Sequence, residues 1–261
     1  MRVVGRIYTA LFILFLMAPI VAIVGGSLTT TNYVSFPPKG LTLHWYLQIL
    51  HQSESIAALG LSLAVGAAAA TLATLLALPV GIALSRYRTG LNGLVYLVVM
   101  TPAMLPSVFL GLAFLVLYTS MGLAATPAGL LAGHVMIATP FALSLVMVGL
   151  SGLDGALERA ARSLGASPFR AFLRITLPLI SWSLAAGWAF AFMISFGSLE
   201  VSLFLSTSTM VTLPVQIFMA LEWSPLDPAL TAVSSGLAII TLIVLVVAAQ
   251  FVSLERFLRR V

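Results

Sequence analysis

The residues able to do chemistry are few, and many of the charged ones lie in one stretch, residues 158–178. Charged side chains make up only 7% of the 261 residues, yet this stretch holds Glu158 and the four arginines Arg159, Arg162, Arg170 and Arg174. The sequence contains no G-x-x-x-x-G-K-[ST] phosphate loop, no H-E-x-x-H zinc motif and no G-x-S-x-G nucleophile motif. The stretch is therefore a candidate for docking a partner, and the chain is not expected to hydrolyse ATP or to be an enzyme.

Local signals predict how this stretch folds. Asp154 can cap a first helix, and Gly165 suits the left-handed residue that ends it. Ser167 can then cap a second helix that begins at Pro168. A helix–glycine–helix loop is rigid, so residues 154–174 are expected to transmit force between two membrane spans.

The rest of the chain is apolar enough to be an integral membrane protein. Hydrophobic residues make up 61% of it and the mean hydropathy is +1.15, whereas soluble domains carry about 25% charged residues. The absence of cysteine excludes disulfides and thiolate metal sites. We predict an all-α polytopic membrane protein, a single domain over residues 1–261. Six transmembrane helices are expected at approximately 7–26, 56–84, 94–118, 128–150, 177–199 and 229–252.

The distribution of basic residues between the two sides of the membrane predicts the orientation of these spans. Eleven of the twelve fall on one side of the membrane, and only Lys39 falls on the other. The positive-inside rule then predicts cytosolic termini and a cytosolic loop 154–174. This topology accounts for the net charge of +5 without a nucleic-acid partner. Residues 201–228 become an external loop, in which Pro214, Pro225 and Pro228 disfavour a long helix.

Three of the apolar spans contain prolines, a histidine or small residues that predict local structure. Pro102 and Pro106 predict an interrupted third span. The interruption could line the translocation route, or it could be only a structural kink in a packed bundle. His134, the only histidine within a span, is expected to be a hydrogen-bonding packing residue. Small residues spaced four apart in the second span predict close helix contact, in two series: Gly60, Ala64 and Ala68, and Gly66, Ala70 and Thr74.

Residues 158–178 resemble the cytoplasmic EAA loop of permease subunits of bacterial ATP-binding-cassette (ABC) importers. The residues in register with that motif are Ala160, Ala161, Gly165, Ile175, Leu177 and Pro178. The position of the motif's glutamate is occupied by Arg159, and Glu158 lies one residue earlier. The span spacing, Arg86 to Arg88, Pro102 with Pro106, and residues 213–218 (LPVQIF) resemble the spermidine/putrescine-type branch.

The resemblance implies a type I ABC importer permease fold in the bacterial cytoplasmic (inner) membrane. It implies four kinds of partner: a second permease subunit, similar or identical; two ATPase subunits, which would bind ATP and Mg²⁺; an external substrate-binding protein; and the lipid bilayer. No cofactor or metal is expected in this chain. The ATPase-coupling residues would be Glu158, Ala160, Ala161, Gly165 and Ser167.

The transported solute stays open at this level. Related permeases carry an acidic pair at the outer end of span five, but Gly197 and Ser198 stand here and the nearest acid is Glu200. A polyamine, an amino-acid-like or opine-like solute, or iron(III) are the alternatives. The residues expected on the translocation path are Ser195, Phe196, Ser198 and Glu200.

Two other classes of function are weaker. A self-sufficient secondary transporter or channel is the main alternative, but proton-coupled carriers usually need ionisable groups within the membrane, and these spans hold no Asp, Glu, Lys or Arg. A membrane-embedded enzyme would need convergent catalytic groups, which three scattered histidines and seven acids do not supply.

Overall fold

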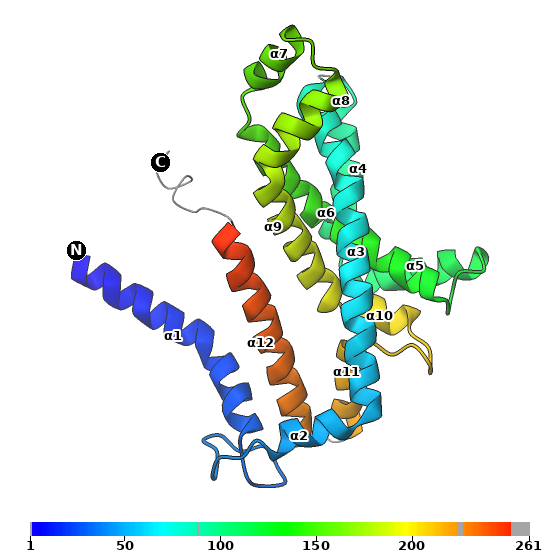
Figure 1. Cartoon of the computed structure of the whole chain (residues 1–261). Helices are drawn as coiled ribbons and strands as arrows, with labels where there is room; N and C mark the ends of the chain where they lie inside the picture. Colours follow the sequence, from blue (N-terminus) through cyan, green and yellow to red (C-terminus); the bar gives the residue numbers. More distant parts are fainter. Residues whose placement is uncertain (1, 88, 224–226, 252–261) are drawn as a thin grey trace. The chain divides into compact units, whose positions relative to one another are not determined.

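The structure, a computed structural model, describes residues 2–87, 89–223 and 227–251 (Figure 1). Every named element in those ranges is helical, so the all-α prediction is confirmed. The elements are α1 (Arg2–Ser27), α2 (His44–His51), α3 (Ser53–Arg86), α4 (Asn92–Met104), α5 (Ser107–Ser120), α6 (Pro127–Ser151), α7 (Gly155–Ser163), α8 (Pro168–Ala171), the π-helical turn η1 (Phe172–Thr176), α9 (Leu177–Phe196), α10 (Glu200–Leu205), α11 (Leu213–Trp223) and α12 (Pro228–Phe251).

Four stretches of the described chain are long and apolar enough to cross a membrane as single helices. They are Val4–Ser27, Ser53–Arg86, Pro127–Ser151 and Pro168–Phe196, and they contain the expected first, second, fourth and most of the fifth spans. The expected third span is the bent pair α4 and α5, which passes the same test when the two helices are taken together. The expected sixth span, 229–252, corresponds to α12, and its last residue lies outside the described ranges.

The third span is interrupted, as predicted, and Pro106 is the cause. α4 ends at Met104, and Leu105 is extended (φ −90°, ψ 144°), as expected for a residue that precedes proline. α5 restarts at Ser107, and the two helices meet at 104°. Pro102, by contrast, lies inside α4 without ending it. The break therefore turns the chain sharply rather than bending it gently.

The expected external loop 201–228 is more helical than predicted, because it contains most of α10 and all of α11. Two of the three prolines stand at helix starts, where they are tolerated. Pro214 is the second residue of α11, where its missing N–H has no helical partner to lose. Asp227 then caps α12 through a 2.8 Å hydrogen bond from the backbone N–H of Ala229 to its carboxylate. Pro214 thus stands in the first turn of the 11-residue α11 and Pro228 is the first residue of α12, whereas Pro225 lies outside the described residues.

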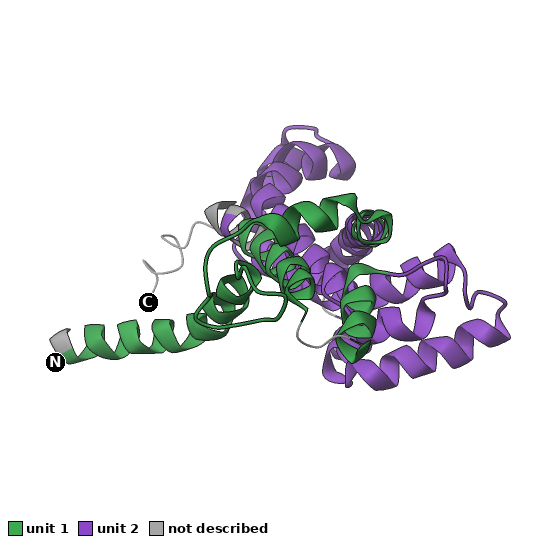
Figure 2. Cartoon of the chain, turned by 90° about the horizontal axis from the view of Figure 1, so that it is seen from below, with its two compact units in different colours: residues 1–60, 212–243 green, residues 61–211, 244–261 purple. Residues whose placement is uncertain are grey.

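The chain divides into two compact units, coloured separately in Figure 2. Unit 1 comprises residues 1–60 and 212–243, and unit 2 comprises residues 61–211 and 244–261. In unit 1 the Tyr46 hydroxyl bonds both Ser27 (2.6 Å) and Ser235 (2.5 Å). These contacts tie α2 to the end of α1 and to α12. Most large apolar side chains of α1 are exposed, so most of its surface is left for lipid or another chain.

Unit 2 contains the segments on which the site is built. Its buried apolar cluster consists of Val65, Leu110, Phe114, Tyr118, Leu130, Ile137, Val201 and Leu205. α6 packs along α9, and α5 packs against α10. The small residues of α3 contribute unequally. A Cβ added at Gly66 would lie 3.0 Å from the Phe192 ring, so that series packs closely as predicted.

Among the described residues, the other small-residue series of α3 does not make the predicted close contact at Gly60 and Ala64. Gly60 and Ala64 are both exposed, and a Cβ added at Gly60 would meet nothing within 4 Å. The two series lie on different faces of one helix, and only the face with Gly66 and Ala70 turns toward the chain's own helices.

Candidate coupling site

The charged stretch folds as a helix, a glycine turn and a second helix, as predicted. The Asp154 carboxylate accepts a 2.8 Å hydrogen bond from the N–H of Ala156 at the start of α7. Gly165 follows α7 with a φ of +91°. The N–H groups of Gly165 and Ala166 bond the carbonyls of Arg162 and Ala161, both at 3.0 Å, which is the Schellman pattern of a helix end.

The second helix begins as the sequence indicates but continues differently. Ser167 accepts a 3.3 Å hydrogen bond from the N–H of Arg170, and Pro168 is the first residue of α8. After one turn the backbone widens into η1 and then continues as α9. Pro178 has no N–H to bond to the carbonyl four residues earlier, which disfavours regular α-helical bonding here. The loop is therefore continuous with the fifth span.

The five residues predicted to contact an ATPase subunit lie on two faces of this element. Ala160, Gly165 and Ser167 are exposed, and no atom lies within 4 Å of a Cβ added at Gly165. Ala161 is half-buried. Glu158 is turned inward, with only 19% of its side chain exposed.

Sequence reasoning missed three large apolar residues on the exposed surface of the same element. Leu164 is 90% exposed, Phe169 70% and Leu157 49%. Leu157 and Leu164 are seven residues apart, which places them on one side of a helix, with Ala160 and Ala161 between them. The sequence does contain a signal for this surface, because Leu157 and Leu164 recur at helical spacing among the arginines. Beside them, a hollow of about 630 Å³ is lined by Arg159, Arg162, Ser163, Gly165, Ala166, Ser167 and Pro168.

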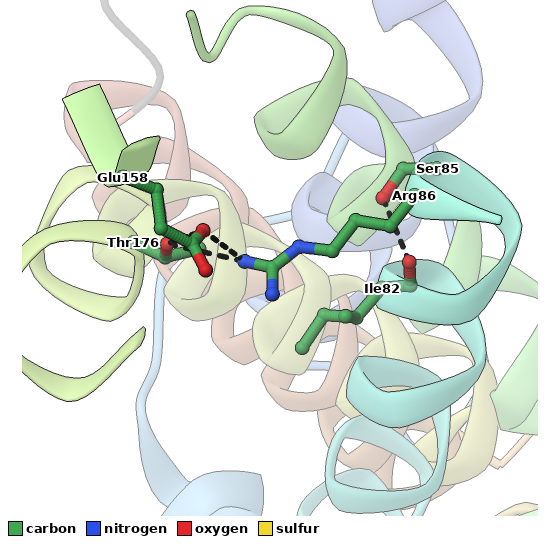
Figure 3. Close-up of polar contacts among 5 residues, drawn as sticks. All are labelled: Ile82, Ser85, Arg86, Glu158 and Thr176. Atoms are coloured by element: carbon green, nitrogen blue, oxygen red, sulfur yellow. Dashed lines mark hydrogen bonds and ion pairs between the residues drawn. The ribbon is translucent and has the colours of Figure 1, made fainter. Parts of the chain in front are cut away.

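Glu158 takes part in a three-residue polar contact, drawn in Figure 3. Its carboxylate oxygen Oε2 accepts from the Arg86 guanidinium at 2.5 Å and from the Thr176 hydroxyl at 3.1 Å. Arg86 also donates to the Thr176 hydroxyl oxygen at 3.3 Å. The three residues come from the end of α3, from α7 and from η1. We call this contact the Arg86–Glu158–Thr176 triad.

The residues expected on the translocation path gather where α9 ends and α10 begins. Ser195 and Phe196 are the last two residues of α9, and both are buried. Ser198 lies in the break and is also buried, whereas Glu200, the first residue of α10, is partly exposed. Within the chain Ser195 and Phe196 thus face packed neighbours, and their place on a translocation path stays a prediction.

His134 of α6 bridges the break between α9 and α10 with two hydrogen bonds. Its Nδ1 lies 2.8 Å from the Ser195 hydroxyl and its Nε2 lies 3.0 Å from that of Ser202. Ser202 uses its own proton on the Ser198 carbonyl, at 2.7 Å. Ser202 must therefore accept from an Nε2–H, which leaves Nδ1 to accept from Ser195. The imidazole thus connects α9 to α10, and the packing role predicted for His134 is confirmed.

Elsewhere, unit 1 contains a polar pocket of about 530 Å³ between the start of α3, α11 and the start of α12. Its ionisable lining residues are His51, Glu54 and Asp227. Among the described residues no three His, Cys, Asp or Glu side chains are grouped so that they could hold a metal ion.

Comparison with known proteins shows which family this chain belongs to. Residues 73–260 match the family described as binding-protein-dependent transport system inner membrane component. The chain is 31% identical over 229 residues to the putrescine transport system permease protein PotI of Escherichia coli, covering 85% of this chain and 80% of that protein. It is 28% identical over 256 residues to the spermidine/putrescine transport system permease protein PotC of Escherichia coli, covering 97% and 94%.

A further relative is the putative 2-aminoethylphosphonate transport system permease protein PhnV of Salmonella typhimurium, 28% identical over 258 residues, with 98% of this chain and 94% of that protein covered. Among solved structures, a chain of a bacterial ABC transporter that imports the acidic polysaccharide alginate has a TM-score of 0.72 at 16% identity, covering 96% of each chain. A structure of a bacterial alginate ABC transporter in complex with an alginate pentasaccharide-bound periplasmic protein gives 0.66 at 17%, covering 98% and 94%. The predicted fold is confirmed, and the chain belongs to the binding-protein-dependent inner membrane components, the permease subunits of ATP-driven importers.

Proposed function

We propose that α7 and the turn after it are the contact through which an ATPase subunit drives this permease. The observation that carries the proposal is the exposure of Leu157 on α7, Leu164 in the turn after it and Phe169 on α8, among the arginines of this stretch. Large apolar side chains on a water-facing surface mark a binding surface, and the described part of the chain leaves Leu164 and Phe169 mostly and Leu157 about half uncovered. The neighbouring arginines add positive charge around the apolar centre.

The partner with which this surface is compatible is a soluble ATPase with a groove for a short helix. Ala160, Gly165 and Ser167 lie beside the exposed leucines and present little bulk, so another surface can approach the backbone of α7 closely. The permease would act with a second permease subunit and two such ATPases, which would bind ATP and Mg²⁺. An external binding protein would deliver the solute, and ATP hydrolysis would belong to the partners rather than to this chain.

Replacing Leu164 by aspartate is expected to abolish binding of the ATPase subunit while leaving the permease folded. The side chain is 90% exposed, so the change should affect the chain's own stability by less than about 0.5 kcal/mol. In the docked state it would place an unpaired charge in an apolar contact, which is costly. Co-purification of the ATPase subunit with the permease from the membrane measures the effect. Leu91→Asp, at a residue 64% exposed outside this element, is the matched control.

If Leu164→Asp retained the ATPase subunit at the wild-type ratio, the docking surface would be placed wrongly. Loss of the subunit in both aspartate variants would indicate a general effect of the added charge and would also contradict the proposal.

The chain is an inner membrane protein, and we propose that the coupling site faces the cytosol. The charge count supports this orientation, because an external loop would place four arginines against the positive-inside bias. A reporter active only in the cytoplasm, fused after Ala166, is expected to give signal, and the same reporter fused after Glu222 is expected to be silent. The reverse pattern would separate the loop from the compartment that contains ATP.

For the solute, we propose a small molecule that carries a protonated amine. The named solutes of the three relatives above, putrescine, spermidine and 2-aminoethylphosphonate, share that group. The unit 1 pocket, which has Glu54 and Asp227 in its lining and no Lys or Arg, lies in segments expected at the external side and is compatible with a cation. Calorimetric binding of these amines and of iron(III) to the cognate external binding protein decides between the classes, and binding of iron(III) alone would exclude an amine.

A further inference from the structure

The acid of the charged stretch does not face outward with the rest of the coupling site. Glu158 stands one position before the place of the motif's glutamate, and successive residues of an α-helix are rotated by about 100°. That rotation turns Glu158 from the exposed side of α7 toward the chain itself. Arg159, which occupies the motif position, is exposed instead.

The contacts of Glu158 form a closed triangle rather than a single ion pair. The Oε2 atom of Glu158 accepts two hydrogen bonds, and the Arg86 nitrogen Nη2 that donates one of them also donates to the Thr176 hydroxyl. Thr176 is 3% exposed, whereas Arg86 and Glu158 keep 33% and 19% of their side chains exposed. An exposed ion pair alone would contribute little. A buried hydroxyl that bonds both ions holds the two side chains in one geometry.

The triad joins α7 directly to α3, which also contacts α9 through a 2.9 Å hydrogen bond from the Trp188 indole N–H to the Thr71 hydroxyl. α7 is linked by the backbone to α6 before it and to α8, η1 and α9 after it. α3 ends at Arg86, 72 residues before Glu158. The 2.5 Å contact between these side chains gives α7 a direct link to the second span, and Thr176 ties the same point to the root of α9.

We infer that the Arg86–Glu158–Thr176 triad passes movement of α7 to α3 and to the start of α9. In this assignment Glu158 is a positioning residue that acts through Arg86, and it does not contact the ATPase subunit. The inference rests on the proposed function for the source of the movement, whereas the existence and rigidity of the link are properties of this chain alone. Movement of the coupling helix would then reach three spans at once.

The rigidity of the link can be measured with the full chain, which contains no native cysteine. Spin labels attached at Ala83→Cys on α3 and Ser163→Cys on α7 report the distance between these helices by double electron–electron resonance. The otherwise unchanged chain should give one narrow distance distribution. Glu158→Gln and Arg86→Gln should broaden it, and the exchange R86E with E158R should narrow it again. Arg162→Gln, which removes an exposed charge from the same helix, should leave it unchanged.

Thr176 provides a second test that does not depend on tolerance of the charge exchange. Thr176→Val keeps the shape but lacks the hydroxyl, and it should broaden the distribution. Thr176→Ser keeps the hydroxyl and should not. If both Glu158→Gln and Thr176→Val leave the distribution as narrow as in the parent chain, the triad does not hold these helices together.

Functional measurements distinguish two roles for Glu158, a link within this chain and a contact with the ATPase subunit. In the assembled transporter in nanodiscs, Glu158→Gln should keep the ATPase subunits bound to within about twofold, but should lower the stimulation of ATP hydrolysis by the binding protein about tenfold. Loss of the bound subunits with an unchanged label distance would overturn the assignment and make Glu158 a contact residue. Failure of the unmodified chain to bind any ATPase subunit would overturn the proposed function instead, while the label distances would still decide whether the link exists.

Discussion

Replacing Gly165 by valine is expected to reduce ATP-driven uptake to background while the chain still inserts into the membrane. The φ of Gly165 is +91°, a conformation that β-branched residues very rarely adopt. Forcing such a residue into it costs about 1–3 kcal/mol. Space is not the obstacle, because a Cβ at this position meets nothing within 4 Å. The strain should therefore unwind the turn after α7 and displace the docking surface.

The matched variant is Gly165→Asn, because asparagine tolerates positive φ better than other residues with a side chain. It should retain clearly more uptake than Gly165→Val, although its side chain adds bulk at the docking surface. The measurement is uptake of labelled solute into cells, with the amount of permease in the membrane quantified in parallel. Uptake by Gly165→Val equal to that of Gly165→Asn would show that the turn conformation is not required.

Replacing His134 by leucine is expected to destabilise the chain by about 1–3 kcal/mol. The imidazole is 2% exposed and bonds one serine on each side of the break between α9 and α10. Leucine would leave the Ser195 hydroxyl without an acceptor and the Ser202 oxygen without its donor, both in a buried site. Circular dichroism during titration with sodium dodecyl sulfate measures the loss.

A triple variant distinguishes lost hydrogen bonds from lost packing. Replacing all the partners by apolar groups is much less costly than stranding them, so His134→Leu with Ser195→Ala and Ser202→Ala should recover much of the stability. A triple variant that is less stable than His134→Leu alone would contradict this explanation. So would a single variant as stable as the parent chain.

Features set by residues close in sequence were the ones that could be predicted. Asp154, Gly165 and Ser167 determine the ends of α7 and the start of α8 through hydrogen bonds that reach at most five residues. Pro106 determines a break because it acts on its immediate neighbour. Each of these effects is local, so residue type and spacing were sufficient.

Features set by partners distant in sequence could not be predicted. Nothing near Glu158 indicates that its partner is Arg86, and nothing near His134 indicates serines 61 and 68 positions away. The sequence of α3 contains two faces made of small residues. Which of them packs against another helix, the one with Gly66, depends on the tertiary structure. The 104° angle at Pro106 likewise depends on where α5 finds a surface to pack against.

The interrupted third span and the end of the fifth span are not independent of each other. The third span breaks at Pro106 and α9 of the fifth ends at Phe196, and the segments that follow, α5 and α10, pack against one another. The fit is close, since a Cβ added at Gly111 would lie 3.0 Å from the carbonyl oxygen of Glu200. Because α5 and α10 pack closely, a change of the angle at Pro106 must be accommodated where α9 is followed by α10.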